Sequence, residues 1–209
     1  MALPTLTKNP TQVKTGPGII LFKTCVDATT DAAALPVMAV AASKFTNSWT
    51  GWLPLGFTDE GMSLTFGKES EEVVVAEDNF PIRTSVTKLT GVAAFDMSGI
   101  NQENVKLAMS GGNWSVSSSG ATKLSKYSPP APSAVTRVML GFIGADSDEV
   151  IIAYQCFQTG EVSLQRKKGA EKASLKGVTL NFEVPSTVVS NDVWNYWTAG
   201  TWADALTAY

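Results

Sequence analysis

The feature that most constrains the fold is the stretch 52–109, in which strand patterns follow one another before a single short helix. Met62, Leu64 and Phe66 alternate with serine and threonine. Because successive side chains of a strand point to opposite faces of a sheet, this spacing predicts a strand with one buried and one polar face. The run 72–77, EVVVAE, predicts a further strand.

The run 81–97 has the length and pattern of a half-buried strand. From Leu89 onward the odd positions are apolar or small, whereas Thr90 and Asp96 stand at even positions. Gly91 is one of the small residues, and a glycine inside a strand indicates that another group approaches the backbone closely. We therefore expect a long strand that is tightly packed near its middle.

A short helix is predicted directly after this run. The side chain of Asn101 can accept a hydrogen bond from the free amides of a new helix. Val105, Ala108 and Met109 fall at helical spacing, and the glycines at 111–112 provide a stop. The expected helix is roughly two turns long.

Strand patterns also dominate the rest of the chain. The predicted strands outside the central stretch are 18–26, 135–143, 149–158, 161–167 and 178–184. The dipeptide at 159–160, Thr-Gly, predicts a two-residue hairpin turn between two of them. The segment 111–133 is rich in Ser, Gly and Pro and predicts a surface loop with a short strand near Trp114. The fold class is therefore mainly β: a β-sandwich or partial barrel with one short flanking α-helix.

Composition and charge argue against several classes of function. Hydrophobic residues make up 44% of the chain and charged residues 17%, which is typical of a folded protein. The net charge of −3 lacks the basic excess with which proteins grip the phosphates of nucleic acids. We find neither an apolar signal core nor an apolar segment long enough to span a bilayer, so we expect no membrane partner and assembly in the cytoplasm.

The chain contains no histidine, so it lacks the commonest general base and the commonest metal ligand. Glycine-rich nucleotide-binding motifs are also missing. Two acidic groups, at 69–72 and 146–149, are candidates for acid–base chemistry or for holding a cation. We interpret both as solvated or subunit-facing charges. The expectation is a protein that is not an enzyme and needs no cofactor or metal.

Three pieces of the central stretch, in this order, resemble the core of the major tail tube proteins of long-tailed, siphovirus-type bacteriophages. They are LGFTDEG at 55–61, the run 81–97 through Gly91, and the helix start NQEN at 101–104. The resemblance implies one tail-tube-like β domain over 1–185 and an aromatic-rich C-terminal arm over 186–209. It also implies a structural protein of the virion. Its hexameric rings would self-assemble in the host cytoplasm into a hollow tail tube through which DNA passes.

The resemblance and the charge pattern give three sets of candidate contact residues. The inter-subunit sheet is expected to contain Pro81, Val86, Leu89, Gly91 and Phe95. Inter-subunit charge contacts are expected between Glu69, Glu71 and Glu72 of one chain and Arg166, Lys167 and Lys168 of another. The candidate C-terminal interface aromatics are Trp194, Trp197 and Trp202, for which packing on their own subunit and sugar binding are alternatives. Thr84, Thr87 and Thr90 are candidates for side chains that face the bore.

The expected partners are further copies of the chain and other tail proteins, such as the tape measure and terminator proteins, while DNA passes without specific binding. The alternative function is a carbohydrate- or protein-binding β-sandwich, either a phage adhesion module or a cell-surface module. Self-assembly separates the two, because a tube protein forms rings or tubes whereas a sugar-binding domain stays small.

Overall fold

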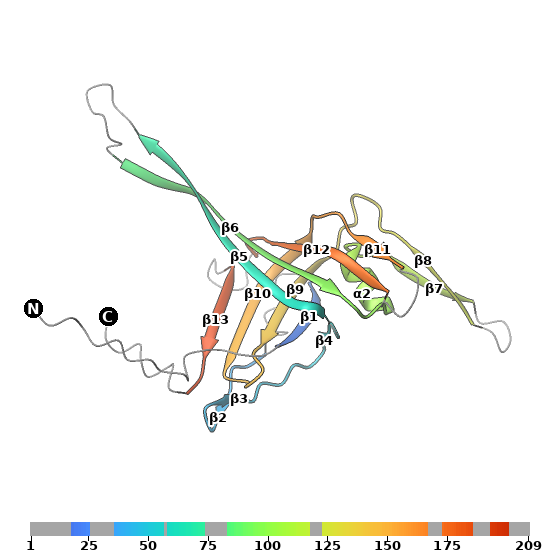
Figure 1. The fold of residues 1–209 in the computed structure, drawn as a ribbon, viewed down its shortest axis with the longest axis horizontal. Helices are drawn as coiled ribbons and strands as arrows, with labels where there is room; N and C mark the ends of the chain where they lie inside the picture. Colours follow the sequence, from blue (N-terminus) through green and yellow to red (C-terminus); the bar gives the residue numbers. More distant parts are fainter. Residues whose placement is uncertain are drawn as a thin grey trace, which may run out of the picture.

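The computed structural model describes residues 18–25, 36–56, 58–73, 83–117, 123–166, 173–185 and 193–200 (Figure 1). Within these ranges the chain forms thirteen strands and one helix, so the predicted mainly β class is confirmed. The elements are β1 (Ile19–Cys25), β2 (Val40–Ala41), β3 (Lys44–Phe45), β4 (Leu53–Pro54), β5 (Thr58–Val73), β6 (Arg83–Met97), α2 (Gln102–Ala108), β7 (Asn113–Ser117), β8 (Leu124–Ser128), β9 (Arg137–Ile143), β10 (Glu149–Gln158), β11 (Ser163–Gln165), β12 (Ser174–Phe182) and β13 (Trp194–Thr198).

Nine of these strands form one sheet, with the order β4-β1-β9-β10-β12-β6-β5 and with β11 and β13 attached to it. The sheet forks at β10, because β13 pairs with residues 149–153 and β12 pairs with residues 156–158. The fork lets β12 and β6 turn across one face of β1, β9 and β10 (Figure 1). The sheet does not close, so the result is a sandwich or partial barrel, as predicted.

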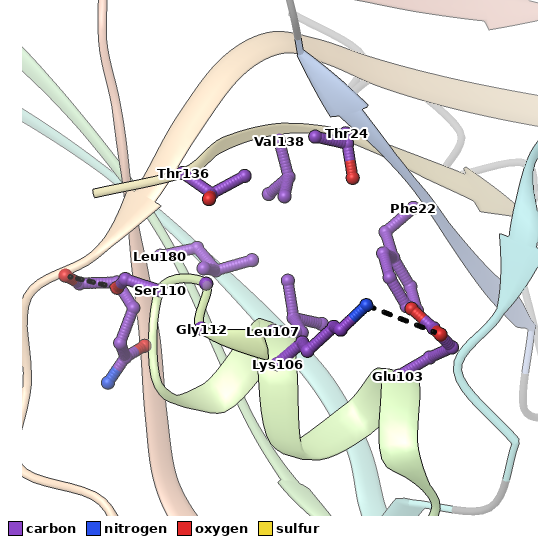
Figure 2. Close-up of a pocket in the computed structure, with 12 residues that line it drawn as sticks. Phe22, Thr24, Glu103, Lys106, Leu107, Ser110, Gly112, Thr136, Val138 and Leu180 are labelled. Atoms are coloured by element: carbon purple, nitrogen blue, oxygen red, sulfur yellow. Dashed lines mark hydrogen bonds and ion pairs between the residues drawn. The ribbon is translucent and has the colours of Figure 1, made fainter. Parts of the chain in front are cut away.

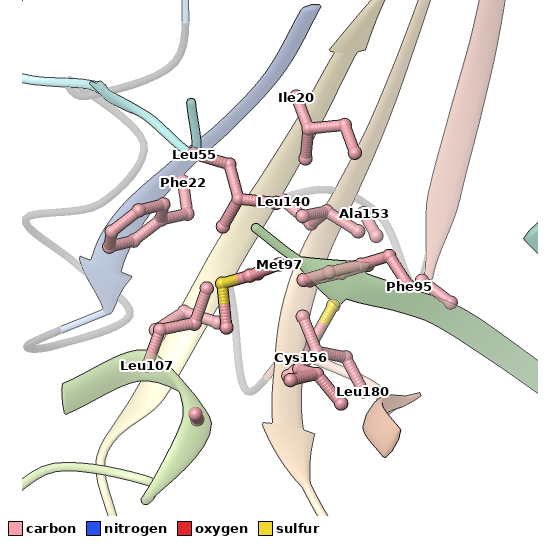
Figure 3. Close-up of a cluster of buried hydrophobic side chains, with 14 of the residues drawn as sticks. Ile20, Phe22, Leu55, Phe95, Met97, Leu107, Leu140, Ala153, Cys156 and Leu180 are labelled. Atoms are coloured by element: carbon pink, nitrogen blue, oxygen red, sulfur yellow. The ribbon is translucent and has the colours of Figure 1, made fainter. Parts of the chain in front are cut away.

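The main core fills the space between the two halves of the fork (Figure 3). Ile20 of β1 and Cys156 of β10 lie on one side, and Phe95 and Met97 of β6 lie on the other. Leu107 of α2 covers one end of this cluster. All five side chains are buried, and burial raises the pKa of the Cys156 thiol.

A second apolar cluster covers the opposite face of the same central strands. Leu21 of β1, Met139 of β9 and Ile152 of β10 contribute to it, because alternate residues of a strand point to opposite faces. Trp52 and Trp197 pack against these side chains from outside. The strands β1, β9 and β10 are therefore buried on both faces.

Helix α2 begins as the sequence predicts. The Asn101 side chain accepts a hydrogen bond from the Asn104 backbone N–H at 2.7 Å. The fully buried Asn104 side chain donates through Nδ2 to the backbone oxygens of Leu55 (2.9 Å) and Gly99 (2.8 Å). These bonds fix the helix against the segments that precede β5 and follow β6.

Three features of the predicted strand pattern differ from the structure. The segment 159–160 is not a hairpin turn, because the strands on either side of it, β10 and β11, do not pair with each other; β11 pairs with β12. The reason is that the Thr159 backbone N–H bonds to the Thr179 oxygen at 3.1 Å, which directs the chain toward β12. Residues 72 and 73 are not part of a separate strand but continue β5; residues 74–77 lie outside the described ranges. In the predicted loop at 111–133, strands β7 and β8 form a hairpin.

Candidate assembly surfaces

The hairpin of β5 and β6 extends beyond the neighbouring strand that supports it. Its strands pair from Thr58 and Met97 to Val73 and Arg83. The pairing of β6 with β12 extends only as far as Val92. Beyond that point, among the residues that the structure describes, the two strands pair only with each other and project from the body (Figure 1). We call this projecting part, residues 67–73 and 83–90, the arm.

One face of the hairpin continues the core-facing side of the sheet out along the arm. Met62 and Leu64 pack against the main core, and Phe66 follows on the same face. Further out, Leu89 and Val86 stand on this face, because they pair with residues 68 and 70. Leu89 is 71% exposed and Val86 is 58% exposed. The arm therefore presents an apolar stripe that its own subunit leaves uncovered.

The opposite face of the hairpin is mostly polar, apart from Val92 near the body and Val73 at the far end of the arm. It carries Ser63, Thr65, Glu69 and Glu71 of β5 together with Lys88 of β6. Glu69 and Lys88 form an ion pair across the strands at 2.9 Å, and both side chains are mostly exposed. An exposed pair of this kind contributes little to stability, so the face is best described as a hydrated surface.

The three threonines that were candidates for facing the bore do not share one face. Thr90 pairs with Gly67 and stands on the polar face, whereas Thr84 pairs with Glu72 on the face of the apolar stripe. Thr87 lies at a bulge in the ladder and donates its hydroxyl to the backbone oxygen of Glu69 at 3.2 Å. The bulge reverses the expected alternation, and it could not be read from the sequence.

Three aromatic rings meet where the arm leaves the body. Phe66 stacks on Trp194 of β13, with ring centroids 4.2 Å apart and an interplanar angle of 21°. Phe66 also meets the edge of Phe182, the last residue of β12, at 6.2 Å. We call Phe66, Phe182 and Trp194 the aromatic cluster. Gly91 pairs with Phe66, and a Cβ at Gly91 would lie only 2.5 Å from Phe182 Cδ2. This is the close approach that the sequence predicts at Gly91.

The residues predicted for an inter-subunit sheet fall into three environments. Val86 and Leu89 are exposed on the arm, and Gly91 lies at its base. Phe95 is buried in the main core of its own subunit. Pro81 lies outside the described residues. Leu89 and Val86 are therefore the members of this set that a second chain can reach.

The structure of a single chain does not bring the residues of the predicted charge contacts together. Glu71 and Glu72 are exposed on opposite faces of the arm. Arg166 is exposed just after β11, at a distance along the sheet from the arm, since β12 and β6 lie between. Lys167 and Lys168 lie outside the described residues. A contact between these groups therefore stays a prediction about two chains.

The aromatic residues near the C-terminus lie on the subunit's own sheet. Trp194 packs against the main core and Trp197 against the second cluster, and both are half-buried; Trp202 lies outside the described residues. Tyr196 is more exposed and donates its hydroxyl to Glu149 Oε2 at 2.9 Å. Burial, followed by this bond and the charge of Glu149, raises the pKa of Tyr196 to about 12. A role of the tryptophans at an interface stays a prediction.

A hollow of about 180 Å³ lies between α2 and strands β1 and β9 (Figure 2). Its wall mixes apolar side chains such as Phe22 with polar ones such as Thr136. Glu103 and Lys106 form an ion pair at its rim, with Nζ 3.8 Å from the carboxylate. No group of three or more potential metal ligands occurs in the described part of the chain.

The structure shows two surface features that were not predicted. One is the stacking of Trp194 on Phe66, which joins residues far apart in the chain and leaves no local pattern. The other is the β7–β8 hairpin, held at its base by the Trp114 Nε1–H bond to Gln102 O (3.1 Å) and the Tyr127 hydroxyl bond to Gly111 O (2.7 Å). The alternation around Trp114 was a usable but weak signal for it.

These features define a class of protein. A mainly β subunit that exposes apolar side chains, Leu89 and Val86, on a projecting hairpin has the form of a structural protein that assembles with other chains. A family model described as phage tail tube protein matches residues 8–191. The chain belongs to this family, and it is accordingly a structural protein of a phage tail. No curated protein matches the chain. Within the described residues, no helix is long and apolar enough to cross a membrane.

We expect Gly91→Ala to destabilise the subunit, because the added methyl group would meet a Phe182 ring that is itself held against Phe66. Overpacking of this kind costs about 1–3 kcal/mol of the free energy of unfolding, measured by urea denaturation. Gly67→Ala is the matched control on the same hairpin. Its methyl group would meet Thr90 Oγ1, which can rotate away. Equal stability of the two variants would contradict this account of the arm's base.

Proposed function

We propose that six copies of the chain join into a ring, that the rings stack, and that the resulting hollow tube carries phage DNA. Membership of the tail tube family supports this proposal, and the resemblance of residues 55–61, 81–97 and 101–104 led to it. The observation that carries it is the apolar stripe of the arm, formed by Leu89 and Val86 beyond Phe66. A stripe continuous with the core of one subunit is suited to be covered by the sheet of another.

The pairing potential of β5 supports assembly through strands. This strand is the edge of the main sheet and is 16 residues long. Its outer backbone groups are therefore available to a strand of a neighbouring subunit. Continuous pairing around a ring would remove these edges, and the stripe would be buried at the same joint. Pro81, Val86, Leu89, Gly91 and Phe95 remain our candidates for this joined sheet, with Phe95 acting from within the core.

The polar face of the hairpin is the better candidate for the wall of the bore. The hydroxyl groups of Ser63, Thr65 and Thr90 can bind water on this face, and the charges of Glu69 and Lys88 neutralise each other. A wall of this kind stays wet but does not fix the phosphates of DNA in place. The apolar stripe on the other face would then point into the tube wall.

The tube is expected to work with other tail proteins. We propose that a tape measure protein occupies the bore during assembly in the host cytoplasm and that a terminator protein ends the tube. The charges of the arm would meet Arg166, Lys167 and Lys168 of a neighbouring chain, and Trp194, Trp197 and Trp202 would lie near a contact between subunits. The chain would have no catalytic role in any of these steps.

Leu89→Asp tests the arm directly. Burying a leucine side chain contributes about 2 kcal/mol, so its loss at one contact should raise the concentration needed for assembly by roughly 30-fold. The subunit itself should unfold at an unchanged temperature, because Leu89 is exposed. Rings and tubes are counted by electron microscopy over a concentration series.

Leu124→Asp is the matched control, since Leu124 is 69% exposed and also lies on a hairpin strand. We expect it to assemble like the unaltered protein. If Leu89→Asp assembled normally, or if both variants failed alike, the arm would not be the assembly surface.

Charge reversal tests the predicted contacts of the basic segment. Changing Arg166, Lys167 and Lys168 to glutamate should weaken assembly, most strongly at low salt, because exposed charge contacts are screened by ions. The control changes Lys44, Lys123 and Lys126 to glutamate, which alters the net charge equally. Sedimentation of both proteins at several salt concentrations compares them, and indistinguishable profiles would reject the contact.

Purified tubes should not retain duplex DNA at physiological salt. The reason is the net charge of −3 together with the paired charges on the polar face. A filter-binding titration measures retention across salt concentrations. Tight binding that weakened steeply with added salt would reveal a phosphate-gripping wall and would refute the proposal for the bore.

A further inference from the structure

The arm leaves the body at one residue pair. Asn181 and Val92 form the last pair between β12 and β6, and Phe66 and Gly91 form the next rung of the hairpin. Beyond this rung the arm has, in the described ranges, only its own two strands to hold it. A two-stranded ribbon is marginally stable and bends readily when nothing supports it. The direction of the arm is therefore decided at this rung.

The aromatic cluster surrounds that rung from two other strands. Trp194 lies nearly parallel to the Phe66 ring, so it supports the hairpin from the side of β13. Phe182 lies over Gly91 at a distance that leaves no room for a Cβ, so it supports the hairpin from the side of β12. Offset stacking and edge contacts both hold rings in defined orientations. Both contacts lie on the core-facing side of the hairpin, so a swing of the arm away from that side would break them, and a swing toward it would be blocked by the Phe182 and Trp194 rings.

The length of the arm amplifies any change at this point. Val73 lies seven residues beyond Phe66, which at about 3.3 Å per residue gives an arm of about 23 Å. A rotation of about 10° at the rung would move the far end by about 4 Å, which exceeds the tolerance of a hydrogen bond. Pairing with a second strand at the far end therefore requires a fixed direction.

We infer that Trp194 is a positioning residue: by stacking on Phe66 it fixes the direction in which the arm leaves the body, and it thereby couples strand β13 to the geometry of assembly. The positioning of the arm is a property of the single subunit. Its consequence for the tube rests on the proposed function.

The experiment measures arm direction in the unassembled subunit. Leu89→Asp provides an assembly-deficient background, and Cys25→Ser removes the partly exposed native thiol. Spin labels are placed on the arm at Ser70→Cys and on β1 at Thr24→Cys, and pulsed electron paramagnetic resonance gives the distribution of distances between them. We expect a narrow distribution with Trp194 present and a broadened one in Trp194→Ala. Phe66→Leu should broaden the distribution likewise. This variant keeps an apolar side chain, so it serves as the test if Trp194→Ala proves unstable.

Two controls separate stacking from general loosening. Trp194→Phe retains an aromatic face and should restore the narrow distribution. Tyr196→Ala removes a more exposed ring two residues further along the same face of β13 and should leave the distribution narrow. A narrow distribution in both Trp194→Ala and Phe66→Leu would overturn the inference. So would broadening by Tyr196→Ala or failure of Trp194→Phe to restore the distribution.

The second part of the experiment measures assembly in proteins that retain Leu89. Trp194→Ala should then give short or irregular tubes, and Trp194→Phe regular ones, by electron microscopy. Regular tubes of Trp194→Ala would overturn the coupling to assembly. If the unaltered protein formed no rings or tubes, the proposed function would fail, while the distance distributions would still decide whether Trp194 positions the arm.

Discussion

The structure depends on the burial of three central strands on both faces. Strands β1, β9 and β10 bury one set of alternate side chains in the main core and the other set beneath the tryptophan-rich segment around Trp52. Their sequences are accordingly almost continuous apolar runs, as in IILF of β1 and VIIAY of β10. Because these strands need cover on both sides, the sheet must fork at β10 and fold β6 and β12 back over it.

The β5–β6 hairpin is covered by the body of the subunit along its inner half only. Its inner half obeys the core pattern, with Ala93, Phe95 and Met97 buried. Its outer half keeps the same alternation but has no cover from the body, so Leu89 and Val86 are exposed. An apolar side chain stays exposed at a cost in solubility, and a contiguous set of them usually marks a contact surface. The same hairpin therefore forms part of the core at one end and the proposed assembly surface at the other.

The sequence sufficed for the features that depend on local periodicity. The alternation of Met62, Leu64 and Phe66, the cap at Asn101 and the close approach at Gly91 were all predicted from neighbouring residues. Features that depend on pairing between residues far apart in the sequence were not predicted. The joining of β5 into one strand through Lys68, the partner of β11, and the stack of Trp194 on Phe66 each rest on residues distant in the chain. A one-residue bulge at Thr87 places Thr84 and Thr90 on opposite faces, where strict alternation would put them on the same face.

The charged side chains of the arm restrict which strands can pair with its uncovered edge. A long edge strand with an apolar stripe invites pairing with any other strand, which is the usual route to aggregation. Lys68 and Glu72 flank the stripe on its own face, and Glu69 and Glu71 line the other. A partner strand must therefore offer a matching order of charges as well as an apolar surface, and few chance partners do. The same side chains that keep a lone subunit soluble would then set the register when a second copy arrives, so that solubility before assembly and precision during it have one structural cause.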